Sequence, residues 1–379
     1  MPSRNFVLVV YSLLAVLHAY IGWRVLPDLP LDTTARTLGA LWLVASFVLV
    51  PAGLLARGIR RQPLSDRVAW VGLLAMGLFS SLLVLTLLRD VVLLLAAIVG
   101  LHSAALVSWT ALAVPSLAVL VSLIGFINAR RTARVVDVEV PIAGLPDALD
   151  GFTIAQISDI HVGPTIKRSY LEAIVDAVNG LKPDLIAITG DLVDGSVRQL
   201  APHTAPLSQL KARHGTYFVT GNHEYYSNAH AWIAELRRLG ITVLMNEHVV
   251  LQHQGASLVV AGVTDYTAHH FDEAHRSDPH AALAGAPENT GAKVLLAHQP
   301  RSAAAAADAG FDLQLSGHTH GGQFLPWNFF VPMQQPYVAG LNRLRQLWVY
   351  TSRGTGYWGP PKRFGAPSEI TRLRLVPAR

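Results

Sequence analysis

The sequence predicts an α/β protein in two parts: a transmembrane segment of about four helices over residues 1–134, and a two-sheet α/β sandwich over residues 135–379. Three observations predict this division. Apolar residues make up 51% of the chain and charged residues only 15%, which is too apolar for a wholly soluble protein. This apolar excess lies in the first third of the chain. After Asp137 the composition is globular, and short strand-like runs alternate with helical ones.

Four uncharged stretches mark the expected membrane helices. They are Asn5–Trp23, Thr37–Ala56, Val68–Leu88 and Val91–Ala129. Each of the first three has about the 20 residues that a helix needs to cross the hydrocarbon core of a bilayer, and the first is longer than the apolar run of a cleaved signal peptide. The fourth is nearly twice as long, yet two helices would leave almost nothing for the hairpin between them. Four or five spans are therefore both open, and five would place the last arginine cluster and the soluble domain outside. Arginine placement favours four, with Val91 to about Gly100 extending the third helix or lying at the interface.

Arginine placement sets the expected orientation of these helices. Residues 1–134 contain 11 Arg, 4 Asp and no Lys. One arginine cluster flanks the loop between the second and third spans and consists of Arg57, Arg60, Arg61 and Arg67. A second cluster follows the last span and consists of Arg130, Arg131 and Arg134. Positively charged short loops stay in the cytoplasm. Four spans therefore predict a multi-pass protein of the inner (cytoplasmic) membrane whose soluble domain is cytoplasmic.

Charge and cysteine content exclude several classes of protein. The net charge of +5 arises in the first part, because the residues after 134 contain 19 basic and 21 acidic side chains. No basic face remains that would argue for a nucleic-acid polymer as partner. The chain has no Cys, which excludes disulfides, thiolate nucleophiles and Cys-ligated metals. Of the 16 His residues, 14 follow Asp137.

The second part contains nine predicted strands and three predicted helices. The strands are Phe152–Ser158, Leu185–Thr189, Thr216–Thr220, Ile241–Met245, Leu258–Val263, Lys293–Ala297, Leu313–Ser316, Leu347–Thr351 and Ile370–Val376. The helices are Lys167–Asn179, Ala229–Leu239 and Ser302–Ala309. Alternating strands and helices followed by a strand-rich end are typical of two sheets flanked by helices.

The stretch Tyr266–Gly291 has no clear periodicity, and we expect a long loop or cap segment there. It contains four histidines: His269, His270, His275 and His280. They could form a metal cluster of their own, but irregular spacing in a loop is more typical of solvated side chains.

Five short polar blocks each follow a strand-like run. They are Ser158–His161, Gly190–Gly195, Gly221–Glu224, Ala297–Pro300 and Ser316–Gly322. Loops at the carboxyl ends of strands are where α/β folds place their sites, so five such ends can converge on one cleft. In the Asp-x-His and His-x-His blocks, alternate residues of an extended segment point the same way. Each pair can therefore aim at one location.

The donors in these blocks predict a metal centre. They are Asp159, His161, Asp191, Asn222, His298, His318 and His320. Imidazole and carboxylate together suit Mn, Fe or Zn, whereas Mg or Ca would not use so much His. The set suffices for two divalent ions if one carboxylate bridges them. A two-metal site acidifies a water and clamps the attacking and leaving oxygens of a displacement at phosphorus. The pattern therefore predicts hydrolysis of a phosphoester substrate.

The ordered set D-x-H, G-D-x-x-D, G-N-H-E, H and G-H-T-H-G-G resembles the calcineurin-like metallophosphoesterase superfamily, from about Asp150 to the C-terminus. The ending S-G-H-T-H-G-G-Q and the segment Ser352–Gly356 resemble its bacterial branch with an N-terminal membrane anchor. The resemblance implies two ion sites that share Asp191 as a bridge. One is formed by Asp159, His161 and His320, and the other by Asn222, His298 and His318.

The resemblance also implies the acid of the reaction. His223 would lie near the leaving oxygen as general acid, because an alkoxide is a poor leaving group. Asp194 matches the carboxylate that orients this imidazole. Gly195 stands where the protein-phosphatase branch has Arg, and Glu224 where many relatives have Asp. These departures favour a small or lipid-linked phosphoester over a phosphoprotein as substrate. We expect a phosphodiester or pyrophosphate bond in a lipid-linked or nucleotide substrate.

Two further residues are candidates for contact with substrate. Arg353 could bind a phosphate by bidentate hydrogen bonds or could lie in a surface turn. Trp327 belongs to the aromatic segment Phe324–Met333, which could form an apolar rim touching a lipid or could pack on the domain's own core. The alternative to an enzyme is a non-catalytic membrane sensor or transporter whose soluble domain binds a phosphorylated ligand. A protein of that kind would be expected to have lost metal donors or the acid, and the sequence retains all of them.

Overall fold

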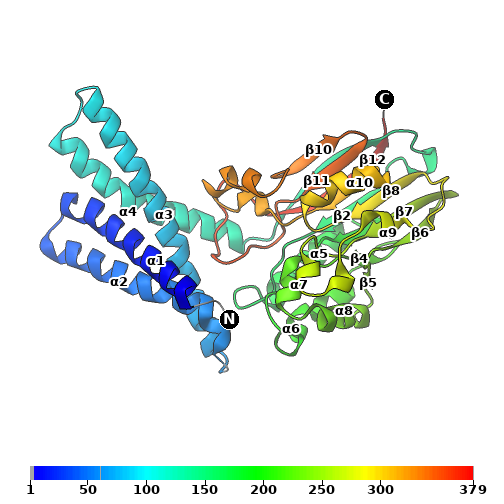
Figure 1. Cartoon of the computed structure of the whole chain (residues 1–379), viewed down its shortest axis with the longest axis horizontal. Coiled ribbons are helices and arrows are strands. Elements are labelled where there is room, and N and C mark those ends of the chain that lie inside the picture. Colours follow the sequence, from blue (N-terminus) through cyan, green and yellow to red (C-terminus); the bar gives the residue numbers. More distant parts are fainter. Residues whose placement is uncertain (1–3, 60, 379) are drawn as a thin grey trace. The chain divides into compact units, whose positions relative to one another are not determined.

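The computed structural model describes residues 4–59 and 61–378, and its contacts divide the chain into two units. The first unit is residues 1–127 with 359–362, and the second is residues 128–358 with 363–379. Apolar helices make up most of the first unit, and the second contains both sheets (Figure 1). Arg60, one of the arginines used to predict orientation, lies outside the described residues.

The described part of the chain contains four helices that are long and apolar enough to cross a membrane. They are α1 (Arg4–Val25), α2 (Thr33–Leu55), α3 (Leu64–Ile98) and α4 (Ala104–Arg130). The predicted number of spans is therefore confirmed. Residues 91–98 continue α3, which is one of the two arrangements predicted for them. Gly100, with φ of 71°, lies in the turn that separates α3 from α4.

Paired charges and small residues hold the helices of the first unit together. Arg24 donates to Asp90 at 2.8 Å, and Arg89 donates to Asp28 at 2.6 Å, so the charges that interrupt the apolar sequence of α3 have partners within the unit. Gly72 lies so close to α2 that a Cβ there would collide with backbone. Small residues allow this close helix approach.

The second unit contains two mixed six-stranded sheets (Figure 1). The first has the order β1 (Arg134–Ile142), β12 (Glu369–Pro377), β2 (Thr153–Ile157), β3 (Leu185–Ile188), β4 (Thr216–Phe218) and β5 (Thr242–Val243). The second has the order β10 (Gly340–Leu344), β11 (Leu347–Thr351), β9 (Leu313–Ser316), β8 (Ala292–Leu296), β7 (Ala256–Gly262) and β6 (Glu247–His253). The predicted two-sheet sandwich and its nine strands are confirmed. Strands β1, β6 and β10 were not predicted.

Buried apolar side chains form one layer between the sheets and one on each outer face. Phe152, Leu185 and Leu296 belong to the inner layer. The predicted helices α5 (Arg168–Gly180) and α8 (Ala229–Arg238) pack on the first sheet, and α10 (Ala303–Ala309) packs on the second. The described part of this unit also contains the α-helices α6 (Val197–Thr204), α7 (Asn222–Tyr226) and α9 (Pro279–Leu283).

Parallel pairing aligns the strand ends that carry the polar blocks. β2, β3 and β4 are parallel neighbours in which Ile157 pairs with Ile188, and Ile188 with Phe218. In the other sheet β8 and β9 are parallel, with Leu296 paired to Leu315. The five blocks therefore leave neighbouring strands at the same level of each sheet.

Candidate metal centre

Backbone strain is concentrated in the loops that carry the predicted donors. Five of the donors have a positive φ between 50° and 70°: Asp159, His161, Asp191, His318 and His320. A non-glycine residue in this region costs on the order of 1 kcal/mol or more, and such residues cluster at functional sites. The fold therefore stabilises conformations that aim these side chains at one place.

Asp159, His161 and His320 form the first group of donors that could hold a cation. His161 Nε2 lies 3.0 Å from His320 Nε2, and His320 Nε2 lies 3.5 Å from Asp159 Oδ1. All three side chains are buried. Two ring nitrogens and a carboxylate oxygen thus converge from the ends of β2 and β9.

Asp191, His298 and His318 form the second group. His298 Nε2 lies 3.2 Å from Asp191 Oδ2 and 3.2 Å from His318 Nδ1. His298 Nδ1 lies 2.7 Å from the carbonyl oxygen of Thr189, a donor hydrogen bond that directs the Nε2 lone pair to the group. Asn222 Oδ1 is buried and has no hydrogen-bond partner. A bound cation would satisfy this orphaned acceptor.

Asp191 lies between the two groups. Its Oδ2 is 3.2 Å from His298 Nε2 and 4.0 Å from His161 Nε2. Its Oδ1 accepts the backbone N–H of His223 at 2.8 Å, which fixes the carboxylate. One oxygen therefore faces donors of both groups, as a bridging ligand must.

The electrostatics of the two groups fit cations. Asp159 and Asp191 are buried carboxylates, and burial raises the pKa of Asp159. Burial and the neighbouring His298 lower the pKa of His318 to about 3, so its ring is neutral and can donate a lone pair. Burial likewise lowers the pKa of His320. Although burial opposes it, the charge of Asp191 raises the pKa of His298, so a cation would displace a proton from this ring. Imidazoles and carboxylates without Cys are the donor set expected for Mn, Fe or Zn ions.

His223 lies beside the donors, and Asp194 holds it. His223 Nδ1 is 2.5 Å from Asp194 Oδ1, and His223 Nε2 is 4.0 Å from Asp191 Oδ2. Burial alone would lower the pKa of His223, but the charge of Asp191 and the hydrogen bond to Asp194 outweigh it and raise the pKa to about 9. Asp194 Oδ2 also lies 3.4 Å from His161 Nδ1. The geometry can therefore keep a proton on His223 at neutral pH.

Glu224 has a role that the sequence did not reveal. Its buried carboxylate accepts backbone N–H groups of Gly221 at 2.7 Å, Leu192 at 2.8 Å and Asp191 at 3.0 Å. It thereby joins the loop after β3 to the first turn of α7. Gly221 approaches Asp191 so closely that a Cβ would collide with its carboxylate. Position 224 tightens the site without contributing to either donor group.

Arg363 also braces the site and was not predicted. Its buried guanidinium donates to the carbonyl oxygens of His320 at 2.8 Å and Arg353 at 2.7 Å, and lies 3.2 Å from His320 Nδ1. Arg353 itself, a predicted substrate contact, donates from Nη1 to Glu369 Oε2 at 2.8 Å. Its guanidinium is therefore engaged in an ion pair within the domain.

Aromatic side chains surround the acid and the last donor loop. Tyr226 and Trp358 lie with their ring centroids 5.1 Å and 5.7 Å from that of His223, and both are exposed. Trp327, the other predicted substrate contact, is 41% exposed and lies 5.8 Å from the Phe330 ring. Tyr226 and Trp358 were not predicted, because they are far apart in the sequence and both lie near His223 only in the folded chain.

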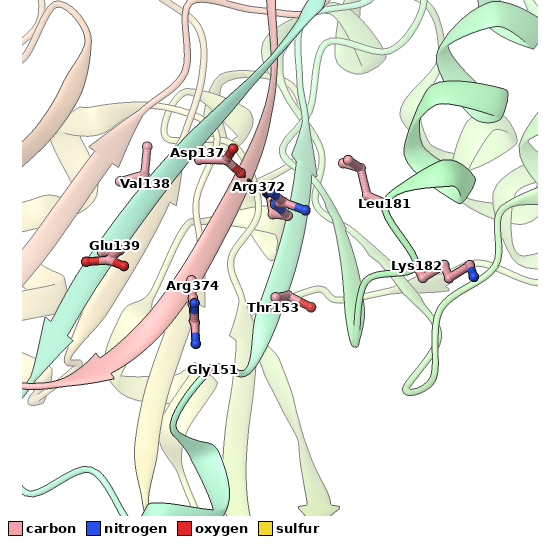
Figure 2. A pocket seen from close by; sticks show the side chains of 9 residues that line it. All are labelled: Asp137, Val138, Glu139, Gly151, Thr153, Leu181, Lys182, Arg372 and Arg374. Atoms are coloured by element: carbon pink, nitrogen blue, oxygen red, sulfur yellow. Dashed lines mark hydrogen bonds and ion pairs between the residues drawn. The ribbon is translucent and has the colours of Figure 1, made fainter.

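A separate cavity of about 360 Å³ lies at the opposite end of β2 (Figure 2). Asp137, Thr153, Arg372 and Arg374 are among its lining residues, and Arg372 donates to Asp137 at 2.5 Å. Thr153 begins β2, whereas Asp159 follows its end. The cavity is lined by none of the predicted metal donors.

Comparisons with known proteins identify the family of the second unit. Residues 152–322 match the family described as calcineurin-like phosphoesterase. The chain is 42% identical over 281 residues to a transmembrane protein with metallophosphoesterase domain from Bos taurus, covering 70% of this chain and 63% of that protein. It is 40% identical over 226 residues to an uncharacterized metallophosphoesterase of Helicobacter pylori, covering 59% and 60%. It is 32% identical over 227 residues to another from Aquifex aeolicus, covering 59% and 84%.

A two-sheet α/β sandwich that gathers His and Asp side chains at its strand ends defines an α/β protein with a candidate metal centre. The chain belongs to the calcineurin-like phosphoesterase family. It spans 63% of the length of the bovine relative. The predicted assignment to a bacterial branch is not borne out, because a mammalian protein is as similar as the bacterial ones. The motif behind that assignment consists of candidate metal donors and turn residues, and it does not separate bacterial from eukaryotic relatives.

Proposed function

We propose that this protein is a membrane-anchored phosphoesterase that uses two divalent ions to hydrolyse phosphodiester or pyrophosphate bonds of lipid-linked or nucleotide substrates. The position of Asp191 carries the proposal, because its Oδ2 faces donors of both groups. Asp159, His161 and His320 would hold one ion, and Asn222, His298 and His318 the other. Two ions so held would activate water and neutralise charge on the phosphoryl group.

In this proposal His223 is the general acid. Its Nδ1 is held by Asp194, which leaves Nε2 facing the donors, 4.0 Å from Asp191 Oδ2. A protonated Nε2 can give its proton to the leaving oxygen as the bond to phosphorus breaks. Asp194 keeps the ring oriented and stabilises its charge.

The surroundings of His223 support a leaving group with an apolar or aromatic portion. Tyr226 and Trp358 are 57% and 49% exposed beside the ring, so their faces are available to a ligand. Nucleobases stack on such rings and acyl chains pack against them. Phe329 and Phe330, 71% and 53% exposed, add a second apolar surface in the segment after the last donors. Exposure of these rings favours a lipid-contacting rim over a segment packed on its own core.

A triple substitution tests the rim. Replacing Trp327, Phe329 and Phe330 by Ser should lower activity on lipid phosphoesters in vesicles and spare a soluble aryl phosphodiester. Tyr266→Ser, at an exposed aromatic residue of another loop, is the matched control. Equal loss of activity on both substrates in the triple variant would contradict a role in lipid contact.

The proposed location is the inner membrane with the catalytic domain in the cytoplasm. The positions of four arginines support this orientation. Arg57, Arg61 and Arg67 flank the loop between α2 and α3, and Arg130 is the last residue of α4. By the positive-inside rule, both of these positions are cytoplasmic.

The central experiment is turnover by the full-length protein in detergent, supplied with Mn²⁺, against bis-p-nitrophenyl phosphate and a panel of nucleotide, lipid and sugar phosphoesters. Metal-dependent hydrolysis that Asp191→Asn eliminates is the expected result. Binding of phosphoesters without turnover would instead favour the non-catalytic sensor. Turnover that persists in Asp191→Asn would contradict the two-ion assignment.

A further inference from the structure

A second convergence of donor side chains lies outside the two-ion centre. His230 is in the first turn of α8. Asp272 caps the 3-10 helix Glu273–His275 in the loop after β7, and His275 is the last residue of that helix. Asp272 Oδ2 lies 3.0 Å from His230 Nε2 and 3.9 Å from His275 Nε2. The His230 and His275 ring centroids are 4.9 Å apart. Residues 42 positions apart along the chain thus point three donor atoms at one spot.

These separations match the spacing that a tetrahedral cation requires. With metal–ligand bonds of about 2.0–2.1 Å, neighbouring donors of a tetrahedral site lie about 3.3 Å apart. The distances from Asp272 Oδ2 to the two histidine nitrogens, 3.0 Å and 3.9 Å, bracket that value. A small approach of His275 would equalise them, and the solvent-exposed side, where His230 is 68% exposed, leaves room for a fourth ligand.

The other polar atoms of two of these donors are already engaged. Asp272 Oδ1 accepts the backbone N–H of Ala274 at 3.0 Å, so Oδ2 is the oxygen that faces the histidines. His275 Nδ1 lies 3.0 Å from the hydroxyl of Tyr225. With its proton on Nδ1 and donated to Tyr225, His275 presents the lone pair of Nε2 to Asp272. Such outer contacts orient the ligands in metal sites.

We propose that His230, Asp272 and His275 form a third metal site that binds a single borderline transition-metal cation, Zn²⁺ above all, in addition to the two ions of the catalytic centre. Two imidazoles and one carboxylate are a donor set suited to Zn²⁺ and unsuited to Mg²⁺ or Ca²⁺. One of the two imidazoles, that of His275, comes from the loop whose histidines were predicted to be solvated. The second comes from α8, where no pattern in the sequence predicted it.

The site is joined to the catalytic centre through α7. Tyr225, the hydrogen-bond partner of His275, is one residue from Glu224 and two from His223 in that helix. Phe271 packs on the rings of Tyr225 and Tyr226, at 5.8 Å and 5.6 Å. A cation that clamps Asp272 and His275 to His230 would therefore hold this loop against the helix that carries the acid.

Zinc stoichiometry of the full-length protein in detergent tests the proposal. After equilibrium dialysis against Zn²⁺, bound metal is measured by mass spectrometry for the wild type, His230→Ala and the control His270→Ala, an exposed histidine of the same loop. We expect His230→Ala to bind one equivalent less than the wild type and His270→Ala to bind the same number. Equal binding by His230→Ala and the wild type would overturn the proposal, as would an equal loss in His270→Ala.

A second pair of variants excludes misfolding as the cause. Asp272→Asn keeps the oxygen that caps the 3-10 helix, and Tyr225→Phe leaves all three donors in place. Losing an outer partner typically weakens metal binding about 10–100-fold. We expect Tyr225→Phe to weaken Zn²⁺ binding at the third site by this factor. Asp272→Asn should weaken it at least as much. If Tyr225→Phe, Asp272→Asn and His230→Ala all bind Zn²⁺ as tightly as the wild type, the contact between His230 and Asp272 is only a hydrogen bond. That result would refute the metal site.

Discussion

His223 Nδ1 lies 2.5 Å from Asp194 Oδ1, and both side chains are buried. Although burial alone would raise it, the charges of His161 and His223 hold the pKa of Asp194 below its usual range. A permanently charged carboxylate therefore sits against one nitrogen of an imidazole whose other nitrogen faces the metal donors. This arrangement is what the proposed role of His223 as general acid requires.

Replacing His223 by Ala should affect substrates according to their leaving groups. General acid catalysis contributes about 10²–10⁴-fold where the leaving oxygen is basic. We expect a loss of that size in kcat for an alkyl phosphodiester, and a smaller loss for a p-nitrophenyl ester, whose leaving oxygen needs less protonation. Metal content, measured in parallel, should not change. Equal losses on the two substrates would contradict the assignment of His223 as acid.

Replacing Asp194 by Asn should shift the pH dependence of the reaction. The raised pKa of His223, about 9 against an ordinary value of 6.5, keeps the ring protonated below pH 9 and lets the proton leave above it. Removing the charge of Asp194 lowers that pKa, so the alkaline limb of kcat should move toward lower pH, within the window from 9 to 6.5. An unchanged alkaline limb in Asp194→Asn would show that Asp194 does not act through His223.

Asp191→Asn should remove metal as well as activity. The substitution weakens the one oxygen that faces donors of both groups. Bound Mn²⁺, measured by mass spectrometry after dialysis, should fall by at least one equivalent. Asp312→Asn, at a partly buried carboxylate that accepts a backbone N–H of Lys293, serves as the control and should keep its metal. Full metal content in Asp191→Asn would argue against a bridging role.

The strands that bear the site could be predicted, because each is an apolar run followed by a polar block. The three missed strands lie at or near sheet edges and lack that signal. β1 alternates exposed charges such as Asp137 and Glu139 with apolar residues, and the residues of β6 and β10 are mostly exposed or half-buried. A run with few buried side chains has a weak hydrophobic pattern, and its partner strand decides whether it forms.

The metal donors could be named from their motifs, whereas their supports could not. Glu224 and Arg363 act through backbone atoms of distant loops, and only the fold brings those loops together. The same applies to His230 and Asp272, which are unremarkable in sequence. A motif identifies a residue by its neighbours along the chain. These contacts join residues that are far apart in the sequence, so no motif indicates them.

Glu224→Ala should destabilise the catalytic unit. It would leave the buried N–H groups of Gly221, Asp191 and Leu192 without an acceptor, at about 1–3 kcal/mol for each unsatisfied group. Glu224→Gln retains one side-chain oxygen and should cost less. Thermal melting of the full-length variants with Mn²⁺ present should therefore rank wild type above Gln and Gln above Ala. Equal melting temperatures for all three would show that these hydrogen bonds contribute little.

Reporter fusions should settle the side of the membrane on which hydrolysis occurs. With four spans and the arginines of residues 57–67 inside, the loop near Leu29 and the loop near Gly100 face outward, and the chain after Arg134 faces the cytoplasm. In a bacterial host, alkaline phosphatase fused after Arg134 should be inactive and a green fluorescent protein at the same point should fluoresce. Fusion at Leu29 should give the reverse and serves as the internal control. Substituting Arg57, Arg61 and Arg67 by Gln should weaken this preference, because the positive charge that retains the loop is removed. An active alkaline phosphatase after Arg134 in the unsubstituted protein would place the metal centre outside, where only extracytoplasmic phosphoesters could reach it.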